Sequence, residues 1–161
     1  MSGVETWTVT IPGTPRPQGK LTGGRGGAGA HYPPTTIEHR VRCEYAMRQE
    51  WRPRPPIGKG TPVEVTIVAS FPRPLRHYGT GRNLGVLKAS APATPHAQIP
   101  DPDKLARLVL DALKNARVLH DDAQVSQLIV EKRWAPRTTE PWTRVTVRTV
   151  DVLAPRQETA P

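Results

Sequence analysis

Four aspartates stand at the two ends of residues 101–122, where Asp101 and Asp103 precede an apolar stretch and Asp121 and Asp122 follow it. The chain has only 14 acidic residues against 23 basic ones, so four aspartates at the ends of one short stretch are an unusual concentration of acids. Carboxylate oxygens are the ligands that hard cations such as Mg²⁺ take in proteins. A metal held there would activate water and stabilise the leaving oxygen of a phosphodiester, and Mn²⁺ is a possible substitute.

The stretch between the acids has the period of an α-helix. Asp101 is a good N-cap, Pro102 fits the first helical position, and Asn115 is a plausible left-handed terminator. As an alternative to metal binding, acids in the first turn complement the helix dipole, which is worth about 0.3–1 kcal/mol. The apolar positions that step by three or four are Leu105, Leu108, Val109, Ala112, Leu113 and Ala116.

Arg107 lies four residues after Asp103 and four before Asp111. One interpretation is a surface ladder of ion pairs, worth a few tenths of a kcal/mol. The other is a cation beside the metal site that stabilises charge on a phosphate. We interpret Asp111 as structural, and neither His96 nor His120 stands at metal-ligand spacing from another histidine.

The separation of the two acidic pairs leaves two arrangements open. A helix from Asp103 to Asn115 is about 20 Å long. Extended residues 116–122 span about 23 Å and would just return to the helix start. Otherwise the third carboxylate comes from a second subunit in a two-fold homodimer.

The net charge of +9 favours a polyanionic partner, and nucleic acid is the leading candidate. The long loops 12–34 and 72–100 are rich in Gly and Pro and hold no acid. The first is a phosphate-contacting loop or a disordered connector, and the second is expected to be a basic arm that orders on a partner. The candidate DNA-binding residues are Arg16, Lys20, Arg25, Arg73, Arg76, Arg82, Lys88 and Lys104.

The single cysteine, Cys43, excludes an intramolecular disulfide and a cysteine zinc site. No apolar run approaches a membrane span, and residues 1–7 do not read as a signal peptide. We therefore expect no membrane partner, no small-molecule cofactor and an intracellular location.

The remaining periodicities predict one small α+β domain over residues 1–153, with a mixed sheet packed on two helices and a frayed tail at 154–161. In the helix at 35–51, Ile37, Val41, Tyr45 and Arg48 step along one side. The last two strands are expected to pair as an antiparallel hairpin. The β-α-β-α-β-β order comprises strand 5–11, helix 35–51, strand 61–71, the central helix, and strands 123–134 and 142–152.

The segments DPDK, LVLDALKNARV and HDDAQV resemble the RusA family of Holliday junction resolvases over residues 99–134. That family shows D-x-D-N at a helix start, D-A-L within an apolar run, and D-D before a strand. The resemblance implies that Asp101, Asp103 and Asp122 bind magnesium. A family lysine falls at Arg107, and Lys104 stands where asparagine is usual.

The resemblance further implies a homodimer that nicks opposed strands of a four-way DNA junction as a pair. It also implies a location in the cytoplasm of a bacterial or phage-infected cell. Two alternatives stay open. One is a DNA-binding module without turnover, in which the acids serve only as caps and turns. The other is a related nuclease that acts on flaps or other branched DNA.

Overall fold

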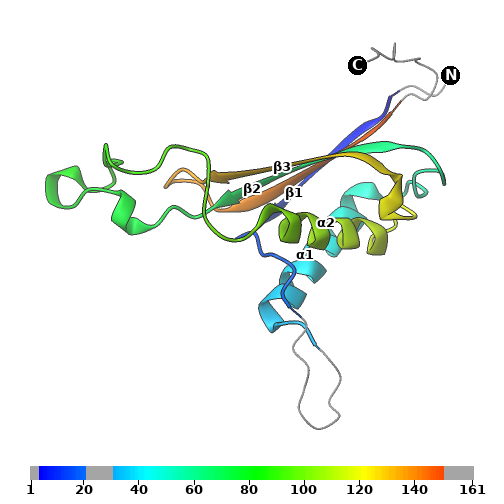
Figure 1. Ribbon diagram of the computed structural model, residues 1–161, viewed down its shortest axis with the longest axis horizontal. Helices are drawn as coiled ribbons and strands as arrows, with labels where there is room; N and C mark the ends of the chain where they lie inside the picture. Colours follow the sequence, from blue (N-terminus) through cyan, green and yellow to red (C-terminus); the bar gives the residue numbers. More distant parts are fainter. Residues whose placement is uncertain (1–3, 21–30, 151–161) are drawn as a thin grey trace, which may run out of the picture.

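A computed structural model describes residues 4–20 and 31–150, and over these residues the chain forms two α-helices and a four-stranded sheet (Figure 1). The fold is α+β, and the predicted β-α-β-α-β-β order is confirmed. The predictions for Arg25 and for the tail at 154–161 lie outside the described residues. The elements are β1 (Thr6–Pro12), α1 (Pro34–Trp51), β2 (Val63–Phe71), α2 (Pro102–Asn115), β3 (Val125–Trp134) and β4 (Trp142–Thr149).

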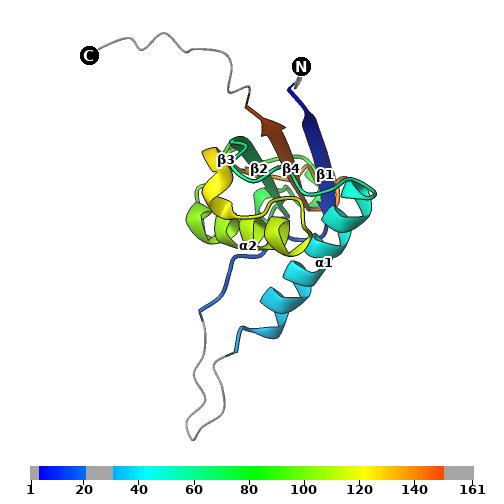
Figure 2. The ribbon, with the colours of Figure 1, turned by 90° about the vertical axis from the view of Figure 1, so that its right-hand side faces the viewer.

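The strand order in the sheet is β1-β4-β2-β3 (Figure 2). β2 and β3 are parallel, and β4 is antiparallel to both β1 and β2. The predicted β3–β4 hairpin is therefore wrong. Because α2 carries the chain back across the sheet, β3 lies parallel beside β2. β4 then pairs with the other edge of β2 and lies between β2 and β1.

Both helices cover one face of the sheet (Figure 2). Val65, Ile67, Val145 and Val147 alternate inward from β2 and β4 and are at most 2% exposed. Burying each such side chain contributes about 1.5–3 kcal/mol relative to leaving it in water. The opposite face is polar, and Arg148 pairs there with Glu64 across β4 and β2.

α2 presents the predicted stripe to this core, since Leu108 and Leu113 are at most 1% exposed. Its end differs from the prediction. Asn115 is the last helical residue, but the left-handed backbone falls at Arg117, with φ +60°. Asn115 instead joins the helices, because its Nδ2 donates to Glu44 Oε1 at 2.7 Å and its carbonyl accepts from Arg48 Nη2 at 3.0 Å.

The side of α1 along which Ile37, Val41, Tyr45 and Arg48 step does not face the core. Ile37, Val41 and Tyr45 are 38%, 54% and 66% exposed. The face that packs against the core is mixed in size and polarity, whereas the more regular apolar stripe is left outside. The buried positions are Thr36, His39, Cys43, Met47 and Trp51.

Residues 72–100 form an arm that projects beyond the sheet (Figure 1). Two short 3₁₀ turns, at 75–77 and 81–83, and a bridge between Tyr78 and Leu87 give it a defined path. Lys88 Nζ donates to the Arg76 carbonyl at 3.0 Å, and Arg73 Nη1 donates to the Pro92 carbonyl at 2.7 Å. These contacts hold the arm to itself, and its ordering on a partner stays a prediction.

Within the described segments, no helix has the length and apolar character needed to cross a membrane.

Candidate active site at the ends of α2

Asp101 occupies the predicted N-cap position of α2 with extended backbone (φ −67°, ψ 141°), but its side chain makes no capping hydrogen bond. Lys104 Nζ donates to Asp101 Oδ2 at 2.6 Å instead. This hydrogen bond and the charge of Lys104 lower the pKa of Asp101, and the same contact raises the pKa of Lys104. The carboxylate of Asp101 is therefore ionised and faces a cation rather than the helix end.

Asp103 lies in the first turn of α2 and is exposed. Within residues 4–20 and 31–150 it takes part in no ion pair or side-chain hydrogen bond. Arg107, one turn further, is also exposed and pairs with neither Asp103 nor Asp111 in these segments. The surface ladder is therefore not formed, and both groups are available to a ligand.

A cavity of about 470 Å³ opens beside the start of α2, and Asp101, Lys104 and Arg16 are among its lining residues. The backbone explains why Arg16 lies there. After β1 the chain runs along the helix start, and the Gln18 N–H donates to the Lys104 carbonyl at 3.0 Å. An exposed arginine from the first basic loop thus lies at the same cavity as the Asp101 carboxylate.

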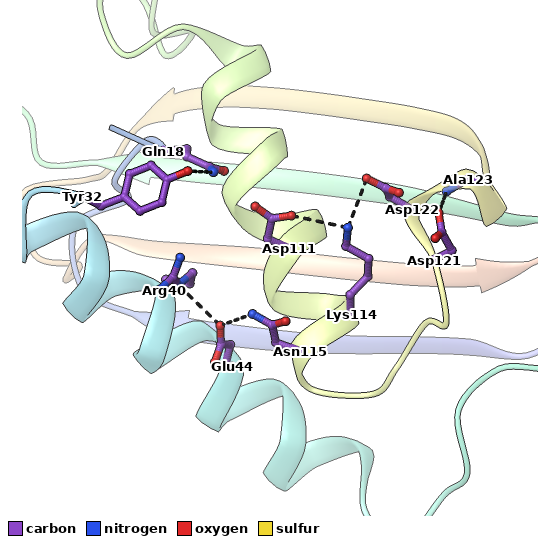
Figure 3. Close-up of polar contacts among 10 residues, drawn as sticks. All are labelled: Gln18, Tyr32, Arg40, Glu44, Asp111, Lys114, Asn115, Asp121, Asp122 and Ala123. Atoms are coloured by element: carbon purple, nitrogen blue, oxygen red, sulfur yellow. Dashed lines mark hydrogen bonds and ion pairs between the residues drawn. The ribbon is translucent and has the colours of Figure 1, made fainter. Parts of the chain in front are cut away.

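The second acidic pair lies at the other end of α2 (Figure 3). Asp122 Oδ2 is 3.4 Å from Lys114 Nζ, which also lies 3.6 Å from Asp111 Oδ1. Asp121 caps the short turn at 122–124, because the Ala123 N–H donates to its Oδ1 at 2.8 Å. That hydrogen bond, followed by a contact with Asp122, lowers the pKa of Asp121. Asp121 is thus structural, and Asp122 faces Lys114.

The described part of one chain contains no group of three or more His, Cys, Asp or Glu side chains able to hold a metal ion. Asp122 returns only as far as Lys114, in the last turn of α2, and does not join Asp101 and Asp103. Two exposed carboxylates still suit Mg²⁺, which is often held by one or two carboxylates together with substrate phosphates. One chain therefore fits a site that substrate or a second subunit completes.

The other predicted DNA-binding residues divide by what their side chains do. Lys20, Arg76 and Arg82 are exposed. Arg73 and Lys88 hold the arm together through the carbonyls described above. Lys104 contacts Asp101.

The sequence analysis missed a group of arginines at the far end of α2. Arg48, Arg52, Arg54 and Arg117 line one cavity there. The run RQEWRPR at residues 48–54 is a signal that could have indicated the first three, whereas Arg117 joins them only through the fold.

The chain is thus a basic α+β domain with exposed carboxylates and an arginine at one helix start, which suits contact with phosphates of nucleic acid. Comparison with known families makes this specific. The sequence model of endodeoxyribonuclease RusA matches residues 12–148, so the chain belongs to the RusA endodeoxyribonuclease family. A search of curated proteins returned no match.

Proposed function

We propose that the protein is a magnesium-dependent endodeoxyribonuclease that resolves four-way DNA junctions by nicking two opposed strands, and that it acts as a homodimer. The observation that carries this proposal is the exposed, unpaired Asp103 beside the Asp101 and Arg16 cavity, in a chain of the RusA family. An exposed carboxylate that forms no ion pair among so many cations is available to a ligand.

Asp101 and Asp103 would hold the metal. A bound divalent ion supplies a Lewis acid and lowers the pKa of water. Arg16, at the same cavity as Asp101, and Arg107, one turn after Asp103, would neutralise the phosphate. Lys104 must release Asp101 before that carboxylate can turn to a metal, so Lys104 regulates how readily the site is occupied.

The homodimer is supported by what one chain lacks. Asp122 pairs with Lys114 at the far end of α2, so the third carboxylate implied by the family has no place at Asp101 in the same chain. In a two-fold dimer, the partner subunit's Asp122 would complete the site, and each dimer would carry two sites. Two sites in one particle also account for paired nicking.

Asp103→Asn tests the enzymatic role. The amide keeps the size of the side chain and removes its charge, so nicking of a synthetic four-way junction should fall by at least about 100-fold. Binding of the junction should stay equal or tighten, because repulsion of phosphate is reduced. Asp111→Asn is the matched control on the same helix and should nick at the normal rate.

The alternative is a DNA-binding module without turnover, and the Lys104–Asp101 ion pair favours it, because it neutralises one candidate ligand. Wild-type protein that binds the junction but never nicks it with Mg²⁺ or Mn²⁺ would establish that alternative. A chain that nicks flaps faster than four-way junctions would instead be a nuclease for other branched DNA.

Mixing two inactive variants tests the shared site. If the partner subunit's Asp122 completes each site, a heterodimer of Asp103→Asn and Asp122→Asn chains has one intact site and regains single nicks. If each chain builds its own site, the heterodimer has none and stays inactive. The two homodimeric variants serve as controls.

A further inference from the structure

A second strongly charged cavity lies where α1 and α2 both end. It measures about 460 Å³ and is lined by Arg48, Arg52, Arg54 and Arg117 together with Trp51. We call it the arginine pocket. No acidic side chain lines it.

These four guanidinium groups share one cavity and carry no counter-charge there. Other arginines of the described residues, such as Arg107 and Arg144, also enter no ion pair, but they do not line this cavity. Elsewhere Arg40, Arg42, Arg133 and Arg148 each pair with a glutamate. The arginine-pocket side chains enter none of the ion pairs found in residues 4–20 and 31–150. Gathering like charges without counter-charge opposes folding, so an anionic ligand is the natural counterpart.

Two of the guanidinium groups are already held in place. Arg48 Nη2 donates to the Asn115 carbonyl at 3.0 Å, and the Arg54 guanidinium lies 5.4 Å from the centroid of the Trp51 ring. Such contacts reduce the side-chain entropy lost when a ligand binds. A planar guanidinium then presents its remaining N–H groups in a fork that matches phosphate oxygens.

The backbone at Arg117 carries a further signal. Its φ of +60° is a conformation that Gly or Asn adopts more easily, and it is the one non-glycine residue with positive φ in the described segments. The Arg117 N–H donates to the Lys114 carbonyl at 2.9 Å, and the Val118 N–H to the Leu113 carbonyl at 3.0 Å, which fixes the turn. An arginine at a backbone position that favours glycine points to a use for its side chain.

We propose that the arginine pocket binds backbone phosphates of one duplex arm of the DNA, at the opposite end of α2 from Asp101 and Asp103. The inference rests on the proposed function and extends it. α2 has 14 residues and is therefore about 21 Å long. A duplex that follows α2 from the Asp103 end reaches the arginine pocket about six base pairs away, at 3.4 Å per base pair.

Helix dipoles offer a competing explanation, because the carboxyl ends of both helices carry partial negative charge that cations stabilise. The two explanations predict opposite effects of Arg117→Gly. If Arg117 serves a ligand, glycine relieves the backbone, the urea midpoint of unfolding stays equal or rises, and junction binding weakens. A midpoint that falls while binding is unchanged would overturn the proposal.

The main test compares Arg52→Gln/Arg117→Gln with wild type in junction binding by fluorescence anisotropy over a range of salt concentrations. Losing two phosphate contacts should weaken binding about tenfold and reduce the slope of log K against log salt by about 2. Arg144→Gln, an exposed arginine on the open sheet face, is the matched control and should bind like wild type. Equal slopes in all three proteins would refute the proposal.

Position is tested with uncharged methylphosphonate linkages placed about six base pairs from the branch point. They should weaken binding by wild type but not weaken the double variant further, because the same contact is already absent. Additive losses would contradict the assignment. If the methylphosphonate test fails, the arginine-pocket proposal is wrong, but the conclusion from Asp103→Asn is unaffected. If the wild type never nicks DNA and the arginine substitutions still weaken binding, only the proposed activity is overturned.

Discussion

The two ends of α2 carry opposite kinds of site on one rigid element. At the start, Asp103 is exposed and unpaired, and Asp101 is held by a single lysine. At the far end, Asp111 and Asp122 form ion pairs with Lys114, and the groups without an ion pair are the arginines of the arginine pocket. The difference suggests that the start of α2 binds the phosphate that reacts, whereas its far end binds phosphates further along the duplex. A helix about 21 Å long then fixes the spacing.

Both ends depend on the buried stripe between them, and Leu108→Ala tests that dependence. Leu108 is 1% exposed, so truncation leaves a cavity and should lower the free energy of unfolding by about 2–5 kcal/mol. Urea unfolding measures this. Nicking and junction binding should then decline together at temperatures where the protein unfolds. Leu87→Ala, on the projecting arm and 46% exposed, should change stability by less than about 0.5 kcal/mol.

Acidification should destabilise the helical layer that supports both ends. His39 is 3% exposed in α1, and burial followed by the charges of Arg42 and Arg16 lowers its pKa to about 4. The unfolded chain binds a proton near pH 6.5, whereas the folded chain does so only near pH 4. Stability from this group is therefore complete above about pH 7 and lost as pH falls, by about 2 kcal/mol at pH 5.

The measurement is the urea midpoint at pH 7 and pH 5 for wild type and His39→Gln. The glutamine variant should be less stable at pH 7 and less sensitive to pH. Equal pH sensitivity in the two proteins would show that His39 is not the titrating group.

The sequence predicted α2 and the placement of its acids because both depend on local spacing. Apolar residues repeating every three or four positions, with Asp-Pro at the start, leave little choice of structure. The order of elements followed from similar patterns. The helix stripe and the positions of Asp101 and Asp103 are therefore the part of the fold that a reader of the sequence could obtain.

The pairing of strands in the sheet could not be predicted from local sequence patterns. The alternation in β4 is equally compatible with β3, β2 or β1 as a neighbour, so the pattern gives the faces of a strand but not its partners. The shortest connection suggested a hairpin, whereas the parallel β2–β3 pair placed β4 elsewhere.

The same limit applies to the site. The Asp122–Lys114 contact, the arginine pocket and the buried face of α1 all arise where separate segments meet. The local periodicity of a sequence does not predict contacts between distant segments. The exposed Val41 and Tyr45 of α1 show that an apolar stripe alone does not identify the side of a helix that faces the core.

Lys104→Asn sharpens the contrast at the start of α2. Removing the ammonium group should raise the pKa of Asp101 towards its ordinary value, because the hydrogen bond from Lys104 lowers it. Asp101 would then be released for a divalent ion, so we expect the Mg²⁺ concentration for half-maximal nicking to fall about threefold. Lys104→Arg keeps the charge and should behave like wild type. A higher Mg²⁺ requirement in the asparagine variant would mean that Lys104 assists the site.

The smallest change in stability is expected at the two acids that share Lys114. Asp111 and Asp122 lie 3.6 Å and 3.4 Å from its Nζ and are both partly exposed, so Asp111→Asn and Asp122→Asn should each change the free energy of unfolding by less than about 0.5 kcal/mol. Nicking should nevertheless disappear in Asp122→Asn and persist in Asp111→Asn, since only Asp122 is proposed to serve the partner subunit's site. Because the two variants lose the same charge beside the same lysine, unequal nicking at equal stability could not arise from the ion pair. Equal loss of nicking in both would instead assign the effect to Lys114 and remove Asp122 from the proposed site.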